Sequence, residues 1–85
     1  MKATLIYRSD SEHGRPVEDF LRDFRIRTGR EVATLDPDSP EGIDMCRTYD
    51  IVEYPTVLAM TDDGQLLNSW RGLPLPTISE VSYYN

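Results

Sequence analysis

The chain has very little of the chemistry that metal and thiol sites require. Its 85 residues include one cysteine, Cys46, and one histidine, His13. A single thiol cannot form an intramolecular disulfide, and it cannot build a zinc or iron–sulfur cage from thiolates within one chain. We therefore expect no metal and no cofactor.

Positive charge and long apolar runs are also scarce. Nine Lys and Arg residues stand against 15 Asp and Glu residues, so the formal net charge is −6. Nucleic acids and anionic membranes are bound chiefly through clustered Lys and Arg, and the composition disfavours both as partners. The first apolar run, residues 3–7, is too short for a signal-peptide core or a membrane span, and we expect a cytoplasmic protein.

The composition is that of an ordinary folded domain. Hydrophobic residues make up 39% of the chain and charged residues 28%, which is too apolar for a disordered segment. A chain of this length has material for one hydrophobic core. We expect a single domain over residues 1–85.

The first third of the sequence predicts a buried strand followed by an amphipathic helix. Residues 3–7, ATLIY, are apolar on both alternating faces, which favours a central strand covered by helices on both sides. Pro16 suits the first position of the helix, and Gly29 marks its end. Four apolar side chains at helical spacing form the buried stripe of this helix: Val17, Phe20, Leu21 and Phe24.

A second strand over residues 31–35 and a short second helix are expected next. Ser39 is the predicted N-cap of that helix, and Pro40 occupies its first position. The inner edge of the helix in the sequence pattern is marked by Ile43, Cys46 and Tyr49 or Asp50, with Met45 and Tyr49 as a neighbouring apolar pair. An apolar setting would bury the Cys46 thiol, and we interpret it as a small core residue.

The last third of the chain predicts a hairpin and a short closing helix. Residues 55–60 form an almost unbroken apolar strand, residues 61–64 have hairpin-turn chemistry, and residues 65–70 return as the second strand. Thr77 and Glu80 fit a capping box that opens a helix of barely two turns.

The order of elements predicts an α/β fold. The first strand, helix and strand form a right-handed crossover, whereas the hairpin adds the last two strands antiparallel. The result is a four-stranded mixed sheet of strand order 2-1-3-4, with helices on both faces.

One long stretch makes the similarity to a known family more than topological. Residues 49–72, YDIVEYPTVLAMTDDGQLLNSWRG, resemble the second half of the thioredoxins, in which a helix ends in Tyr and a Pro-Thr pair opens an apolar hairpin. The matching positions are Tyr49, Ile51, Pro55, Thr56, Gly64 and Gly72. The likeness covers about residues 3–72. The chain thus resembles a small member of the thioredoxin-like and glutaredoxin-like superfamily, with the minimal βαβαββα fold.

This resemblance has two implications for the segment around Pro55. It implies a cis peptide bond between Tyr54 and Pro55, a form found in only about 5–6% of X–Pro pairs in folded proteins. It also implies that the main-chain groups of residue 54 are free to pair with an extended peptide or a thiol ligand.

The chain departs from the family in the loop before the first helix. Thioredoxins and glutaredoxins carry a C-x-x-C motif there, or at least one cysteine, because a helix N-terminus stabilises the thiolate. Here the loop reads RSDSEHGRP over residues 8–16, and Glu12 and Arg15 most nearly take the two cysteine places. Dithiol oxidoreductase activity is therefore excluded.

The preferred hypothesis is a binding module without a catalytic residue or a metal ligand. Its candidate site is the groove between residues 9–15 and residues 53–56, beside the expected cis-proline. A protein or peptide partner, or a small ligand, would bind there. The candidate groove residues are Ser9, Ser11, Glu12, His13, Arg15, Glu53, Tyr54, Pro55 and Thr56.

Two other functions remain open. A thiol- or anion-dependent transferase would use the start of the first helix together with Ser11 or His13. A self-associating assembly domain would use Trp70, Tyr83 or Tyr84, because exposed aromatic residues mark many interfaces. We therefore expect a monomer or a weak homodimer.

Overall fold

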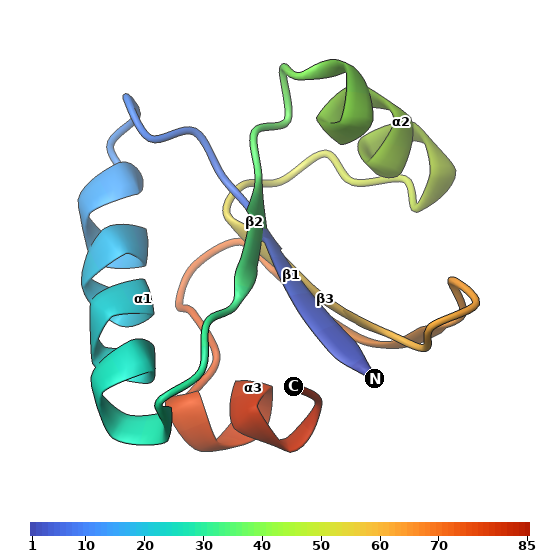
Figure 1. The fold of residues 1–85 in the computed structure, drawn as a ribbon. Helices are drawn as coiled ribbons and strands as arrows, with labels where there is room; N and C mark the ends of the chain where they lie inside the picture. The colour runs from blue at the N-terminus through green and yellow to red at the C-terminus, as the bar shows by residue number, and fades with distance from the viewer.

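The computed structural model describes residues 1–85, and its elements follow the predicted order (Figure 1). The elements are β1 (Lys2–Ile6), α1 (Gly14–Thr28), β2 (Ala33–Leu35), α2 (Pro40–Thr48), β3 (Thr56–Met60), β4 (Leu66–Arg71) and α3 (Ile78–Tyr83). The sheet order is β2-β1-β3-β4, with β1 parallel to β2 and the other two pairs antiparallel. The predicted α/β fold and the strand order 2-1-3-4 are confirmed.

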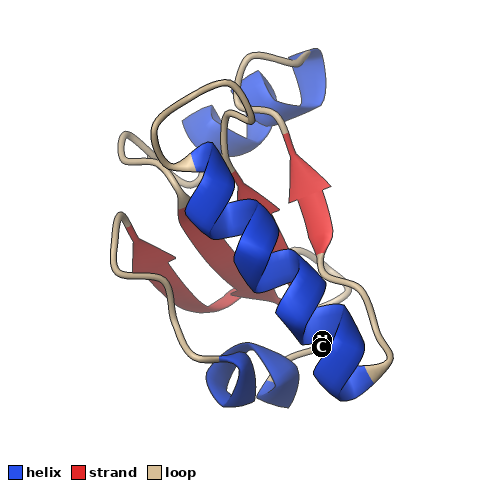
Figure 2. Cartoon of the chain, turned by 90° about the vertical axis from the view of Figure 1, so that its left-hand side faces the viewer, coloured by secondary structure: helices blue, strands red, loops and turns tan.

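The helices lie on opposite faces of the sheet. Helices α1 and α3 lie on one side and α2 lies on the other, as the two views together show (Figures 1 and 2). Successive residues of a strand point to opposite faces, so β1 sends Leu5 toward α1 and Ile6 toward α2. Both side chains are fully buried, as the apolar run predicted.

The larger hydrophobic cluster lies between the sheet and the α1 and α3 helices. Phe24 of α1 and Val81 of α3 are fully buried in it, and burying one such side chain stabilises the fold by about 1.5–3 kcal/mol. The buried members are Ala3, Leu5, Val17, Phe24, Val32, Val57 and Val81.

A smaller cluster lies on the α2 face of the sheet. Its four buried residues are Ile6, Ile51, Leu58 and Met60. Helix α2 contributes only the partly buried side chains of Met45 and Cys46 to it, and Tyr49, which follows the helix, packs beside them. Ile43, expected on the inner edge of α2, is 44% exposed, so that part of the prediction is wrong. Cys46, expected on the same edge, does pack against the smaller cluster, and Met45 packs beside it.

The first turns of α1 and α2 pack against the loops that precede them. A Cβ atom added to Gly14 would lie 2.3 Å from the Ser9 carbonyl oxygen, and one added to Gly42 would lie 1.8 Å from the Asp36 carbonyl oxygen. Helix α1 begins at Gly14, two residues before the predicted start at Pro16. At α2, the Ser39 side chain accepts from the Gly42 N–H at 3.0 Å, so the predicted N-cap is confirmed.

The C-terminal segment closes the α1 face at the end of the sheet that lies opposite the loops before α1 and α2. The predicted capping box is present, because Thr77 Oγ1 accepts from the Glu80 N–H at 3.1 Å and Glu80 Oε1 accepts from the Thr77 N–H at 2.9 Å. The Asn85 side chain accepts from the Ala3 N–H at 3.3 Å and donates to the Glu31 carbonyl at 3.1 Å. None of the three helices combines the length and hydrophobicity needed to cross a bilayer.

Candidate functional site

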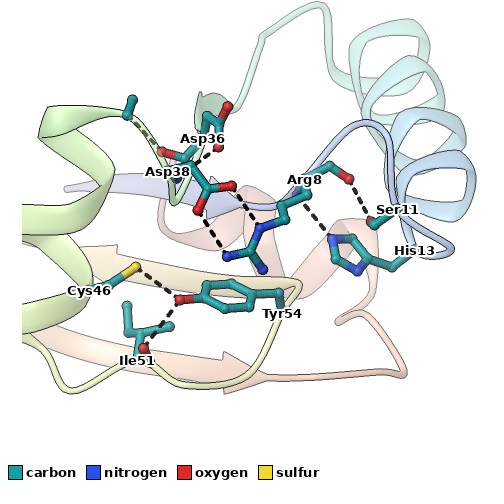
Figure 3. A network of polar contacts seen from close by, with 9 residues as sticks. Arg8, Ser11, His13, Asp36, Asp38, Cys46, Ile51 and Tyr54 are labelled. Carbon is teal, nitrogen blue, oxygen red and sulfur yellow. Dashed lines mark hydrogen bonds and ion pairs between the residues drawn. The ribbon is translucent and has the colours of Figure 1, made fainter.

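Three connections of the chain meet at one end of the sheet. These are residues 7–13 between β1 and α1, residues 36–39 between β2 and α2, and residues 49–55 between α2 and β3. The first and third contain most of the residues of the predicted groove. The contacts that join them pass through Arg8, which was not among the predicted groove residues (Figure 3).

Arg8 links all three connections. Its Nε donates to Asp38 Oδ2 at 2.9 Å, and its Nη2 donates to Asp38 Oδ1 at 3.1 Å. Its guanidinium carbon also lies 4.7 Å from the centre of the Tyr54 ring, within the range of a cation–π contact. These hydrogen bonds raise the pKa of Arg8 and lower the pKa of Asp38, so both groups are charged at neutral pH.

The main chain of Arg8 is held by two side chains of the predicted site. Ser11 Oγ donates to the Arg8 carbonyl at 2.6 Å, and His13 Nε2 accepts from the Arg8 N–H at 3.0 Å. Because Nε2 accepts, the proton of the neutral imidazole is on Nδ1. Burial, followed by the charge of Arg8, lowers the pKa of His13, which favours this neutral form.

Ser11 and His13 are therefore engaged in holding the loop. Nucleophilic catalysis needs a hydroxyl and a base that are hydrogen-bonded to each other. Here each side chain bonds to the main chain of Arg8 instead. No observation at this site favours the transferase hypothesis.

The remaining predicted loop residues do not converge on a common point. Glu12 and Arg15, which take the places of the family's cysteines, are exposed. Ser9 is exposed and borders a small hollow of about 140 Å³ that is also lined by Tyr7 and Asp36. No hollow of the surface is lined by residues from both loops of the predicted groove.

In the segment before β3, the main-chain groups of Tyr54 lack hydrogen bonds, whereas the carbonyls of the residues before and after it accept one each. The Tyr54–Pro55 peptide bond is cis, as expected. Thr56 Oγ1 donates to the Glu53 carbonyl at 2.6 Å, and the Gly72 N–H donates to the Pro55 carbonyl at 2.8 Å. The N–H and C=O of Tyr54 itself make no hydrogen bond within the chain.

The Tyr54 side chain turns toward α2. Its hydroxyl lies 3.6 Å from Cys46 Sγ and 3.5 Å from the Ile51 carbonyl oxygen (Figure 3). The contact with Cys46, together with burial, raises the pKa of the Tyr54 phenol. Cys46 is half-buried and packs against the smaller cluster, and its sulfur lies at the hydroxyl end of the Tyr54 side chain.

The aromatic residues of the assembly hypothesis form a row on the α3 side. The rings of Trp70 and Tyr84 meet edge to face at 5.7 Å, and those of Tyr84 and Tyr83 at 4.9 Å. Trp70 packs against the larger cluster, whereas Tyr83 is exposed. The row therefore serves as edge packing at Trp70 and leaves one ring in solvent.

The geometry defines a thioredoxin-like α/β domain whose loop before α1 carries no thiol. A search of solved structures supports this class: thioredoxin 1 from the thermophilic eubacterium Thermosipho africanus TCF52B matches with a TM-score of 0.64. The match covers 99% of this chain and 89% of that chain at 13% sequence identity. No family model and no curated protein matches the sequence.

Fold and sequence together show that this thioredoxin-like domain has no pair of cysteines. The fold is thioredoxin-like, as the sequence resemblance implied. The chain has one cysteine, Cys46, and therefore no C-x-x-C pair. No three His, Cys, Asp or Glu side chains lie together in an arrangement that could hold a metal ion.

Proposed function

We propose that this chain is a non-redox thioredoxin-like module that binds an extended peptide segment beside Tyr54. The unpaired main chain of Tyr54 carries the proposal. Its N–H and C=O lie next to the start of β3, and the carbonyls on either side of them are already bonded. An unpaired donor and acceptor on one residue match one residue of an extended strand, as in β-strand addition.

The surroundings of Tyr54 support a peptide rather than a compact small molecule. Val52, an exposed apolar residue, is close to Tyr54 in the chain. Leu73, also exposed and apolar, follows Gly72, whose N–H bonds to the Pro55 carbonyl. An extended peptide sends alternate side chains to one side, where such apolar residues can contact them. No enclosed cavity borders Tyr54 that would take a small ligand.

A chemical-shift titration tests the proposal. ¹⁵N-labelled protein is titrated with a mixture of neutral, end-capped pentapeptides built from Val and Thr. We expect the largest shifts at residues 52–56 and 72–73, together with slower hydrogen exchange of the Tyr54 amide. No shift at millimolar peptide, or shifts confined to the hollow lined by Met45 and Met60, would contradict the proposal.

A matched pair of substitutions adds a control. Val52 is 78% exposed and precedes Tyr54 by two positions in the chain, whereas Ile26 is 71% exposed on α1. Val52→Asp should weaken peptide binding several-fold because it places a charge against apolar side chains, whereas Ile26→Asp should leave binding unchanged. Equal effects of the two substitutions would mean that binding is not at Tyr54. Insulin reduction should stay at background with every variant, since Cys46 has no second thiol to pair with.

A further inference from the structure

The space between the two loops of the candidate site is filled by a side chain of the protein itself. Arg8 extends from the end of β1 across the face of the Tyr54 ring to Asp38 (Figure 3). We propose that this side chain, here called the Arg8 strap, holds the site closed, so that a peptide binds only when the strap opens. The inference rests on the function proposed above and adds its regulation.

The strap is fixed at its base and held only weakly at its tip. Ser11 and His13 bind the main chain of Arg8, so opening requires movement of the side chain alone. At the tip, the Arg8 side chain is 38% exposed and that of Asp38 is 66% exposed. Solvent and salt screen an ion pair this exposed, and such a pair can open at little cost.

The strap also explains why no hollow joins the two loops. One face of the Tyr54 ring is covered by the guanidinium at 4.7 Å, and the hydroxyl reaches back to Cys46. A segment that lies along Tyr54 and crosses toward residues 9–13 must pass through the space that the guanidinium occupies. Closed and open positions of Arg8 therefore correspond to occluded and accessible forms of the same site.

The apparent affinity for peptide then depends on how often the strap is open. When a ligand binds only the open fraction of the molecules, its apparent affinity is reduced by that fraction. One exposed ion pair with a cation–π contact favours the closed form by about three- to tenfold. Releasing the strap should therefore strengthen peptide binding by a similar factor, whereas an Arg8 that contacts the ligand directly would give the opposite sign.

The test compares three variants with the same neutral pentapeptide mixture by chemical-shift titration. Asp38→Asn removes the charge that holds the tip, and Arg8→Gln removes the strap. Both should tighten binding about threefold or more. Arg27→Gln is the control, because it removes an equal charge from an exposed residue in the last turn of α1, far along the helix from the groove and the strap.

Salt provides a second, mutation-free readout. Raising sodium chloride from 50 to 500 mM should strengthen binding of the neutral peptides to the unmodified protein, because it loosens the Arg8–Asp38 pair. The Arg8→Gln variant should show no such gain. Binding that is weaker or unchanged in both strap variants would overturn the strap and leave the peptide site intact. Absence of binding in every variant would overturn the peptide site as well.

Discussion

The two faces of the sheet are covered to different depths. On the α1 and α3 face, a fifteen-residue helix and a capped C-terminal helix enclose seven buried residues. On the α2 face, a nine-residue helix shields four buried residues and leaves a hollow of about 590 Å³ beside Met45, Tyr49 and Met60. Most of the enclosed apolar surface therefore lies on one side of the sheet.

The α2 face, here called the shallow face, also carries the candidate site, whereas the α1 and α3 face is here called the deep face. Tyr54, Cys46 and Asp38 all belong to α2 or its flanking connections, and Arg8, which follows β1, contacts Asp38 and Tyr54. Ligand-binding loops are commonly drawn from the less stable parts of a fold, because binding requires movement. The deep face would then hold the sheet in place while the shallow face changes its contacts.

The largest effect should come from a truncation on the deep face. Phe24→Ala removes a fully buried ring from the larger cluster, and we expect a loss of about 3–5 kcal/mol in the free energy of unfolding. Met45→Ala, on the shallow face, should cost only about 1 kcal/mol because Met45 is partly exposed. Urea unfolding followed by circular dichroism measures both. Equal losses would show that the two faces contribute alike.

A somewhat smaller effect is expected at the two glycines that face loop carbonyls. Gly42→Ala should destabilise the protein by about 1–3 kcal/mol, because the new methyl group meets the Asp36 carbonyl. Gly14→Ala makes the same change on α1, where the available distance to Ser9 is longer by half an ångström, and should cost less. The control is Asp44→Ala on the exposed side of α2. Thermal unfolding measures these changes, and an unchanged melting temperature for Gly42→Ala would show that the contact with the Asp36 carbonyl costs no stability.

Loss of the cap on α3 should have an intermediate effect on the deep face. Thr77→Ala removes the side-chain acceptor for the Glu80 N–H and should lower the free energy of unfolding by about 1 kcal/mol. Thr77→Ser keeps the hydroxyl and should stay within a few tenths of a kcal/mol of the unmodified protein. A loss as large for Ser as for Ala would assign the effect to packing of the threonine methyl group.

The smallest effect concerns pH and the loop that anchors the strap. The native pKa of His13 is lowered by burial and by Arg8, so the unfolded chain takes up the proton more readily. The resulting stability is present above about pH 6.5, the ordinary histidine value, and is lost as the pH falls through the lower native pKa. Urea midpoints should therefore decrease from pH 7.5 to pH 5.5. His13→Gln should flatten this part of the profile, because the chain has no other histidine.

The fold could be predicted from the sequence because its signals are local. The apolar runs of β1 and β3, the Ser39-Pro40 start and the Thr77 capping box each predict their element from a few neighbouring residues. The start of α1 was placed two residues too late because Gly14 packs against the Ser9 carbonyl, a contact that no local pattern shows. The inner face of α2 was misjudged at Ile43 because nine residues give too few turns to separate one stripe from the next.

The candidate site was harder to predict for the same reason. Arg8 and Asp38 are 30 residues apart, and in the sequence each is one charged residue among several. Their pairing depends on β1 and β2 lying side by side, with the chain leaving both strands at the same end. The sequence could identify Tyr54 through the family resemblance, but it contained no signal that an arginine would cover its ring.

The hydrogen bond between Asn85 and Ala3 brings the first and last residues of this chain together, as both views show (Figures 1 and 2). A short flexible linker could join residue 85 to residue 1, and new ends could be opened in the exposed turn at Asp62 and Asp63. Such a circular permutant would keep every strand pair of the sheet. It would lose only the covalent connection between β3 and β4. The order of the segments along the chain could thus be changed while their arrangement in space stays the same.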